Sequence, residues 1–233
     1  MSDITDPRSN GAGKIVSSFN RLDLSRGGAN TIPLWKIALD KLGAAVLLLF
    51  FAPFFLIIAA VLKLREGGPI LFAHERIGLN GRRFRCLKFR TMVPDARERL
   101  EALLAADPVA RREWEQTQKL TDDPRISCLG DTLRRTSLDE LPQLFNVLRG
   151  EMSLVGPRPI VEDEQHHYGE NFREYLSVRP GLTGLWQVSG RSNTTYPERV
   201  AMDVEYVRNH SLWSDLRILL RTVRVVLFRD GAC

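Results

Sequence analysis

The feature that most constrains this chain is an uncharged apolar run from Leu42 to Leu62, with Pro53 near its middle. A run of this length can cross a bilayer as a helix, which needs about 20 apolar residues. Proline removes one backbone hydrogen bond and clashes with the preceding turn, so a helix should bend or break at Pro53. The fold must therefore accommodate an apolar helix that bends near the mid-depth of a membrane.

Basic residues flank this run on both sides. They are Arg21, Arg26, Lys36 and Lys41 before it, and Lys63, Arg65, Arg76, Arg82, Arg83, Arg85, Lys88 and Arg90 after it. Basic flanks favour the cytoplasm, so a straight crossing satisfies only one flank, whereas a helix that turns back at Pro53 satisfies both. Charge and proline leave three interpretations open: an ordinary anchor that tolerates proline, a re-entrant helix, and a buried helix of a soluble domain. A signal peptide is not expected, because the run is too long and starts too late.

The overall charge narrows the classes of partner. The 233 residues carry a formal net charge of +5 and a pI of about 9.4, which suits an anionic membrane surface or a phosphorylated substrate. Nucleic-acid binding is not expected, since the sequence has no zinc or helix-turn-helix motif and no basic strands interleaved with aromatic residues. Cys86, Cys128 and Cys233 have no paired spacing, so we expect neither a disulfide framework nor a cysteine metal cluster.

Composition divides the chain into three parts. Residues 1–31 are rich in Ser, Asn, Gly and Asp and are expected to form a mobile tail. Residues 32–65 form the membrane segment. Residues 66–233 are long enough for one domain with its own core, and we expect this domain to end in an amphipathic helix.

The pattern of apolar residues predicts an α+β domain that is mostly helical. Residues 69–92 alternate or run apolar around a turn at Leu79–Gly81, which is typical of a β-hairpin. Helical patterns cover residues 94–119 with a break at Pro108, and also 137–149, 158–177, 196–209 and 214–229.

The last of these helices places Arg217, Arg221 and Arg224 on one face. A basic amphipathic helix of this kind can lie in the membrane interface. It can also pack on the core of the domain with its arginines in water, and the sequence leaves both interpretations open.

Two adjacent acids, Asp139 and Glu140, stand out in the second half of the chain. Ser137 and Glu140 have the spacing of a capping box. Alternatively Asp139 is the cap, which puts Pro142 in the first turn of the helix. In both cases the acids lie at a helix N-terminus, where the helix dipole stabilises them. They are either capping carboxylates or catalytic ones.

Cationic residues recur beside glycine and proline, which hold the backbone stiff. Lys88 and Arg90 share one face of a predicted strand. The guanidinium fork of arginine suits phosphate oxygens, and Mg²⁺ between the acids and those oxygens would reconcile their charges. The candidate substrate-binding residues are Lys88, Arg90, Arg158, Arg179, Gln187 and Arg191.

At these motifs the chain resembles the bacterial sugar transferases, the monotopic polyprenol-phosphate phosphoglycosyl transferases. The resemblance covers residues 33–229, and its motifs follow the order of that family. They are Lys88-Phe-Arg-Thr-Met, Ser137-Leu-Asp-Glu-Leu-Pro-Gln-Leu, Gly150-Glu-Met-Ser-Leu-Val-Gly-Pro-Arg-Pro, Arg179-Pro-Gly-Leu-Thr-Gly and Gln187-Val-Ser-Gly-Arg.

The resemblance implies transfer of a sugar 1-phosphate from a UDP-sugar to undecaprenyl phosphate, with release of UMP. Asp139 matches the nucleophile of the family, which forms an aspartyl-phosphosugar intermediate, and Asp139 and Glu140 would hold Mg²⁺. The sugar is expected to be galactose or glucose, in the first membrane step of exopolysaccharide repeat-unit synthesis. The resemblance also implies a re-entrant helix, although Ala52 stands where the family often has serine.

The same resemblance implies a bacterial inner-membrane location among membrane lipids, with the catalytic domain on the cytoplasmic face. A homodimer is one of the assemblies that it allows. The alternative function is a non-catalytic, membrane-anchored interaction protein of a polysaccharide assembly complex. That alternative explains the basic surface but gives no reason for an acidic pair beside rigid arginine loops.

Overall fold

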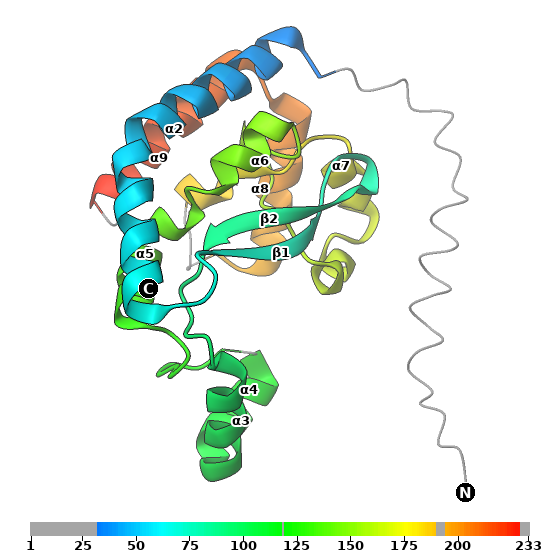
Figure 1. The fold of residues 1–233 in the computed structure, drawn as a ribbon. Helices are drawn as coiled ribbons and strands as arrows, with labels where there is room; N and C mark the ends of the chain where they lie inside the picture. Colours follow the sequence, from blue (N-terminus) through cyan, green and yellow to red (C-terminus); the bar gives the residue numbers. More distant parts are fainter. Residues whose placement is uncertain (1–31, 118, 190–193, 229–233) are drawn as a thin grey trace, which may run out of the picture. The chain divides into compact units, whose positions relative to one another are not determined.

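A computed structural model of the chain describes residues 32–117, 119–189 and 194–228 (Figure 1). From Ile32 onward they form one compact unit. The unit combines helices with two small sheets, which confirms the mixed α+β class.

The apolar run forms helix α2, Leu34–Val61, which continues into a π-helical turn, Leu62–Glu66. Pro53 lies inside α2, and the helix changes direction between its dark-blue first half and its cyan second half (Figure 1). It is the one helix of the described chain that is long and apolar enough to span a membrane, and only 11% of its most apolar stretch is buried. That low burial argues against a core helix of a soluble domain.

The predicted hairpin is confirmed. Strands β1, Leu71–Ile77, and β2, Arg83–Phe89, pair antiparallel. Asn80 and Gly81 in the turn between them have φ angles of 55° and 75°, a left-handed conformation that asparagine and glycine tolerate best.

The break at Pro108 is also confirmed, because α3, Ala96–Ala106, ends before it and α4, Pro108–Thr117, begins at it. Proline suits this first helical position, where a backbone donor would have no partner. Helix α5, Cys128–Arg135, follows, with Ser127 as its N-cap.

A second sheet pairs two strands that the sequence did not predict, β3, Ser153–Val155, and β4, Gly181–Thr183, in parallel. Their loops cross closely, since a Cβ atom on Gly181 would lie 2.1 Å from the backbone nitrogen of Gly156. Gly156 and Gly181 therefore allow the two backbones to touch. This contact fixes the position of the loop after β3, which carries Arg158.

The prediction of a helix over residues 158–177 is wrong for most of this segment. The segment forms two 3₁₀ stretches, Glu162–His167 and Gly169–Asn171, before the short helix α7, Phe172–Leu176. Gly169 has a positive φ of 49°, which interrupts a regular helix.

The two final helices agree with prediction. Helix α8, Tyr196–Asn209, starts at a capping box formed by Thr195 and Glu198. Helix α9 spans Leu212–Phe228.

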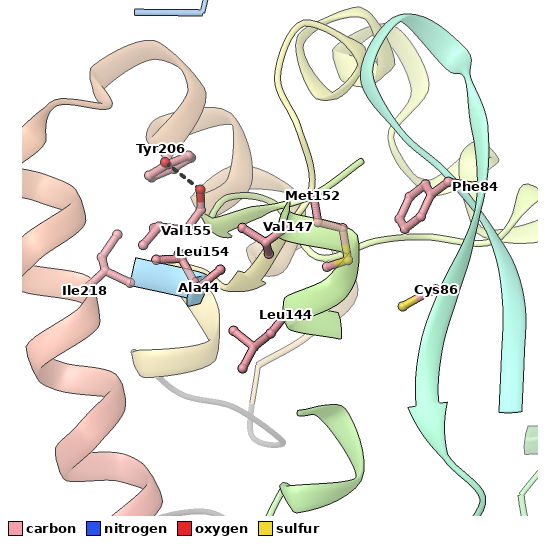
Figure 2. Packing of buried hydrophobic residues seen from close by; sticks show 10 residues of the cluster. All are labelled: Ala44, Phe84, Cys86, Leu144, Val147, Met152, Leu154, Val155, Tyr206 and Ile218. Carbon is pink, nitrogen blue, oxygen red and sulfur yellow. Dashed lines mark hydrogen bonds between the residues drawn. The ribbon is translucent and has the colours of Figure 1, made fainter. Parts of the chain in front are cut away.

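The main core brings together parts of the chain that are distant in sequence. Figure 2 shows Ala44 of α2 beside Leu154 and Val155, with Ile218 of α9 opposite. The cluster also includes Leu144 of helix α6, Gln143–Arg149. The first half of α2 therefore packs directly on the centre of the unit.

A separate cluster joins the end of α2 to the hairpin. Ile58 and Leu62 are buried together with Phe89 of β2 and Leu133 of α5. Both halves of α2 thus pack on the same compact unit.

Candidate active site

The acidic pair lies in a 3₁₀ turn, Leu138–Glu140, that precedes α6. Neither predicted cap forms, because Ser137 makes no capping bond with its side chain and Pro142, not Asp139, is the N-cap of α6. Ser137 has a left-handed φ of 57°, which turns the chain sharply between α5 and the acids. The two carboxylates are therefore not occupied in capping a helix.

Asp139 is almost fully buried, with 8% of its surface exposed. Burial, followed by the charge of Glu140, raises the pKa of Asp139 to about 6, while Lys88 and Arg134 act in the opposite direction. At neutral pH the carboxylate is thus ionised in surroundings that solvate it poorly, which is the state expected of a reactive nucleophile.

The residues around Asp139 hold it beside helix α2. Leu138 and Leu141 pack against the cluster that contains Ile58 of α2 and Leu62 of the π-helical turn after it. The acidic pair therefore sits at a defined place beside the second half of α2.

Lys88 of β2 reaches the acidic pair directly. Its Nζ donates to Oε1 of Glu140 at 2.6 Å. Both side chains are about one-third exposed (30% and 33%), so a ligand can approach them from solvent.

The hairpin extends this charged surface away from the acids. By the strand register, Arg76 of β1 lies opposite Phe84 and His74 lies opposite Cys86, on the face that carries Lys88. Arg76 pairs with Glu164 at 3.7 Å. Burial, followed by the charges of Arg76 and Lys88, lowers the pKa of His74 below its ordinary value, so this imidazole is neutral at pH 7. We call the side chains of Arg76 and Lys88 the cationic face.

Beyond Arg76 the cationic face meets a small pocket around Trp186, lined in part by Arg158, Tyr196 and Asp203. The guanidinium carbons of Arg158 and Arg199 lie 5.9 and 4.7 Å from the centre of the Trp186 ring, which is cation–π geometry. The stiff loop thus directs Arg158 onto an aromatic surface.

Asp203, like Asp139, is a buried acid with a raised pKa. Burial raises the pKa of Asp203 to about 7, against the hydrogen bond from the Tyr168 hydroxyl at 2.7 Å and the charge of Arg158. Its Oδ1 is buried without a hydrogen-bond partner among the described residues.

The other predicted binding residues lie elsewhere. Arg90 is buried and donates from Nη2 to the carbonyl oxygen of Gly67 at 2.6 Å, beside Glu66. It therefore faces the end of the membrane segment, whereas Lys88 faces Glu140.

Arg179 lies against Gly150, within 3.4 Å of a Cβ atom built there. Gly150 is the C-cap of α6, so Arg179 lies at the opposite end of that helix from the acidic pair. Gln187 packs its amide against the turn at Gly184. Arg191 lies outside the described residues.

Arg134 belongs to the site although the sequence did not single it out. Its charge acts on Asp139, and its Nε donates to Oγ1 of Thr91 at 2.8 Å. Its position five residues before Asp139, near the end of α5, was the available signal, but the turn at Ser137 is needed to bring the two together.

The donor atoms fit a magnesium ion only together with a substrate. Three or more His, Cys, Asp or Glu side chains do not converge on a metal position in the described ranges. Asp139 and Glu140 supply two carboxylates, and Mg²⁺ is ordinarily held by one or two carboxylates plus substrate phosphates and water. The pair therefore fits Mg²⁺ that arrives with a phosphate.

Within the described ranges Asp139 is a buried carboxylate beside a second acid, and Lys88 lies next to the pair. This combination of charges suits a phosphorylated substrate. Comparison with known proteins identifies the family. Residues 31–229 match the family model described as "Bacterial sugar transferase", and the chain belongs to this family.

Curated relatives agree with this assignment. The chain is 54% identical over 197 residues to an uncharacterized sugar transferase of Haemophilus influenzae, and 51% identical over 197 residues to the exopolysaccharide production protein ExoY of Rhizobium meliloti. It is 56% identical over 168 residues to the undecaprenyl-phosphate galactose phosphotransferase of Salmonella typhimurium. These matches cover 84%, 84% and 72% of the chain. They span 42% of the Haemophilus protein, 87% of ExoY and 35% of the Salmonella protein.

Proposed function

We propose that this chain transfers a hexose 1-phosphate, from UDP-galactose or UDP-glucose, to undecaprenyl phosphate and releases UMP. The observation that carries the proposal is the buried carboxylate of Asp139 beside Glu140 and Lys88, which accepts no side-chain hydrogen bond from the residues that the structure describes. The name of the Salmonella relative supports the acceptor and galactose, and the name of ExoY supports a role in exopolysaccharide production.

The first chemical step uses Asp139 as the nucleophile. A carboxylate oxygen attacks the phosphorus that carries the sugar. The bond from that phosphorus to the bridging oxygen breaks, and UMP leaves with the electron pair. The product is an aspartyl-phosphosugar, a mixed anhydride that is more reactive than a phosphate diester.

The second step regenerates the enzyme. A phosphate oxygen of the lipid attacks the same phosphorus, the bond to the Asp139 oxygen breaks, and the carboxylate is restored. The product is a lipid diphosphate that carries the sugar, so atoms and charges balance across both steps. A mixed anhydride of this kind needs protection from water, which the burial of Asp139 supports.

The donor is proposed to lie along the cationic face. Four residues of β2 separate Lys88 from Phe84, the partner of Arg76, which corresponds to about 14 Å at 3.4 Å per residue. That length is comparable with an extended nucleoside diphosphate. With the reacting phosphorus at Asp139, Lys88 lies beside the two phosphates, and the far end of the donor approaches Arg76 and the pocket at Arg158.

Mg²⁺ is the proposed cofactor, held by Asp139 and Glu140 together with phosphate oxygens. Its chemistry is to neutralise phosphate charge during transfer. Lys88 and Arg134 assist by placing fixed positive charge beside the acids. Glu140 would exchange its bond to Lys88 for a shared position between the lysine and the ion.

The membrane orientation is proposed to be re-entrant, with both ends of α2 on the cytoplasmic face of a bacterial inner membrane. Ala44 in the first half and Ile58 in the second half are both buried in the same unit. A straight crossing would carry one of these halves away from the domain. The re-entrant path instead keeps both contacts and leaves exposed Leu49, Phe50 and Phe54 for lipid.

Helix α9 supports the same orientation. Trp213, Leu220 and Val223 are 77%, 74% and 57% exposed, and Arg217, Arg221 and Arg224 are also exposed. On a helix with 3.6 residues per turn, the apolar stripe lies next to the basic one. Such a surface is suited to acyl chains on one flank and to lipid phosphates on the other.

The experiment that tests this proposal measures UMP release in detergent or nanodiscs, with a panel of UDP-sugars, undecaprenyl phosphate and Mg²⁺. Asp139→Asn should lower the rate by about 1,000-fold or more, since nucleophiles dominate catalysis. Glu140→Gln should lower it by about 100-fold, and Lys88→Arg should retain more activity than Lys88→Met.

Substantial turnover by Asp139→Asn would exclude the covalent role of this residue. A wild-type protein without Mg²⁺-dependent UMP release from the whole panel would exclude the enzyme and favour the alternative, an interaction protein of a polysaccharide assembly complex.

A further inference from the structure

The first half of α2 carries buried charges that the proposed reaction does not use. Lys36 and Asp40, one turn apart on this helix, are 7% and 1% exposed, and Asp215 of α9 is 0% exposed. Charges are costly to bury unless they are paired and hydrogen-bonded. Two of them at the start of an apolar helix, with a third facing them from α9, therefore need a physical explanation.

Lys36 binds partners from three other elements. Its Nζ donates to Oδ2 of Asp215, to the carbonyl oxygen of Val155 at 2.9 Å and to the hydroxyl of Tyr206 at 3.3 Å. The Tyr206 hydroxyl also lies 2.9 Å from Oδ1 of Asp215. It lies 3.0 Å from the Val155 carbonyl oxygen, a contact that is drawn as a dashed line in Figure 2. The ammonium group is thus fully coordinated by α8, α9 and β3.

Asp40, one turn further along α2, binds strand β3. Its Oδ1 accepts hydrogen bonds from Oγ of Ser153 at 2.8 Å and from the backbone nitrogen of Leu154 at 2.9 Å. It also lies 3.8 Å from Lys36. Strand β3 leads directly into the loop of Arg158, so the cluster joins the membrane helix to a strand of the site.

A neighbouring lysine has a different environment. Lys41 is exposed and makes one bond from Nζ, to the carbonyl oxygen of Leu148 at 2.8 Å. It carries the same charge on the same flank of the apolar run as Lys36. Substitution of Lys41 therefore removes a charge from the positive flank without disturbing the buried cluster around Lys36.

We propose that Lys36, Asp40 and Asp215, joined by Tyr206, form an ionic lock that holds the first half of α2 on the catalytic unit and prevents α2 from crossing the membrane. The inference rests on the re-entrant orientation proposed above. Length does not prevent crossing, because the 28 residues of α2 would extend about 42 Å when straight, more than the hydrocarbon core of about 30 Å. Crossing would pull Lys36 away and leave Asp215 buried without its cation.

The test uses the full chain in cells and reports which side of the membrane the N-terminal segment occupies. A cysteine at position 25 (Ser25→Cys) is the reporter, in a background with Cys128→Ala and Cys233→Ala, while buried Cys86 is kept. Intact spheroplasts and lysed spheroplasts are treated with a membrane-impermeant maleimide. The labelled fraction in intact spheroplasts measures crossing.

Lys36→Met is compared with Lys41→Met, which removes the same charge from the same flank. Wild type and Lys41→Met should be labelled only after lysis. Lys36→Met should raise the labelled fraction in intact spheroplasts by about tenfold or more, since breaking a buried pair shifts an equilibrium at least that far. Tyr206→Phe, which keeps every charge, should give a smaller rise in the labelled fraction. If Lys36→Met does not accumulate in cells, the labelling of Tyr206→Phe tests the lock in its place.

The outcomes separate the lock from the orientation on which it rests. Labelling of Lys36→Met and Tyr206→Phe no greater than that of Lys41→Met would overturn the lock and leave the orientation intact. Labelling of the wild-type reporter without lysis would overturn the re-entrant orientation itself. Neither result depends on UMP release, which tests the proposed reaction separately.

Discussion

Asp139 and Asp215 are both buried carboxylates, at 8% and 0% exposure, but their surroundings differ. The Asp215 carboxylate accepts hydrogen bonds from Lys36 and Tyr206. The Asp139 carboxylate has Glu140 as a neighbour, and within the described ranges the hydrogen-bond donor that acts on it is its own backbone amide. The fold satisfies one acid and leaves the other poorly solvated.

This difference indicates two uses of a buried charge. A paired carboxylate fixes the geometry of the elements that meet at it, because its partners cannot separate without exposing an unpaired charge. An unpaired carboxylate lowers the stability of the folded state and is available for reaction, which is the usual compromise at active sites. Removing each acid or its partner should therefore change stability in opposite directions.

The largest effect on stability is expected at the satisfied acid. Lys36→Met leaves Asp215 buried without its cation and should lower the free energy of unfolding by about 3–5 kcal/mol. Lys41→Met, which removes an exposed ammonium, should lower it by less than about 1 kcal/mol. Chemical denaturation of both variants in the same detergent measures the difference, and equal losses would contradict the distinction.

A smaller effect of opposite sign is expected at Asp139, the proposed nucleophile. The pKa of Asp139 is about 6 in the folded state against an ordinary value of 3.8, so ionisation opposes folding above pH 6 and has no effect below pH 3.8. Asp139→Asn should therefore raise the free energy of unfolding at pH 7.5, by about 3 kcal/mol. The gain should decline as the pH falls toward 3.8.

The control for this prediction is Asp163→Asn, which changes an exposed aspartate in another 3₁₀ stretch. It should leave the thermal midpoint unchanged at neutral pH. A loss of stability in Asp139→Asn at pH 7.5, or a gain that does not vary with pH, would show that Asp139 is satisfied in the folded state.

The smallest effect is expected from the exposed charges on the helix of Asp215. Replacing Arg217, Arg221 and Arg224 by glutamine should weaken binding to anionic vesicles by about 1 kcal/mol per residue at low salt. Replacing the exposed Arg97, Arg111 and Arg112 of α3 and α4 removes the same charge at another place. Vesicle flotation should distinguish the two triple variants, and equal binding would argue against contact between α9 and lipid headgroups.

Local signals in the sequence were sufficient for several elements. The turn at Asn80 and the break at Pro108 each depend on residues within a few positions of one another. The pairing of β3 with β4 was not predictable in this way. Each strand has three residues, too few for a periodic pattern, and the pairing depends on glycines that are distant in sequence.

The site was predictable in its residue types and less so in its geometry. Lys88 binds Glu140, a contact that the sequence did not predict, and the caps predicted for the acids do not form because Ser137 turns the chain. Lys36 shows a second limit. A lysine before an apolar run ordinarily marks the headgroup flank, and its burial against Asp215 depends on helices more than 150 residues away.

The central claim is that the unpaired carboxylate of Asp139 becomes covalently bonded to phosphorus. The most direct test incubates the protein with a UDP-sugar labelled in the sugar, with Mg²⁺ and without undecaprenyl phosphate, followed by an acid quench and peptide mapping. The proposed mechanism predicts one labelled peptide containing Asp139, loss of the label in Asp139→Asn, and release of the label as lipid-linked sugar when undecaprenyl phosphate is added. An enzyme that releases UMP with the lipid present but never carries label on Asp139 would contradict the claim and indicate direct transfer.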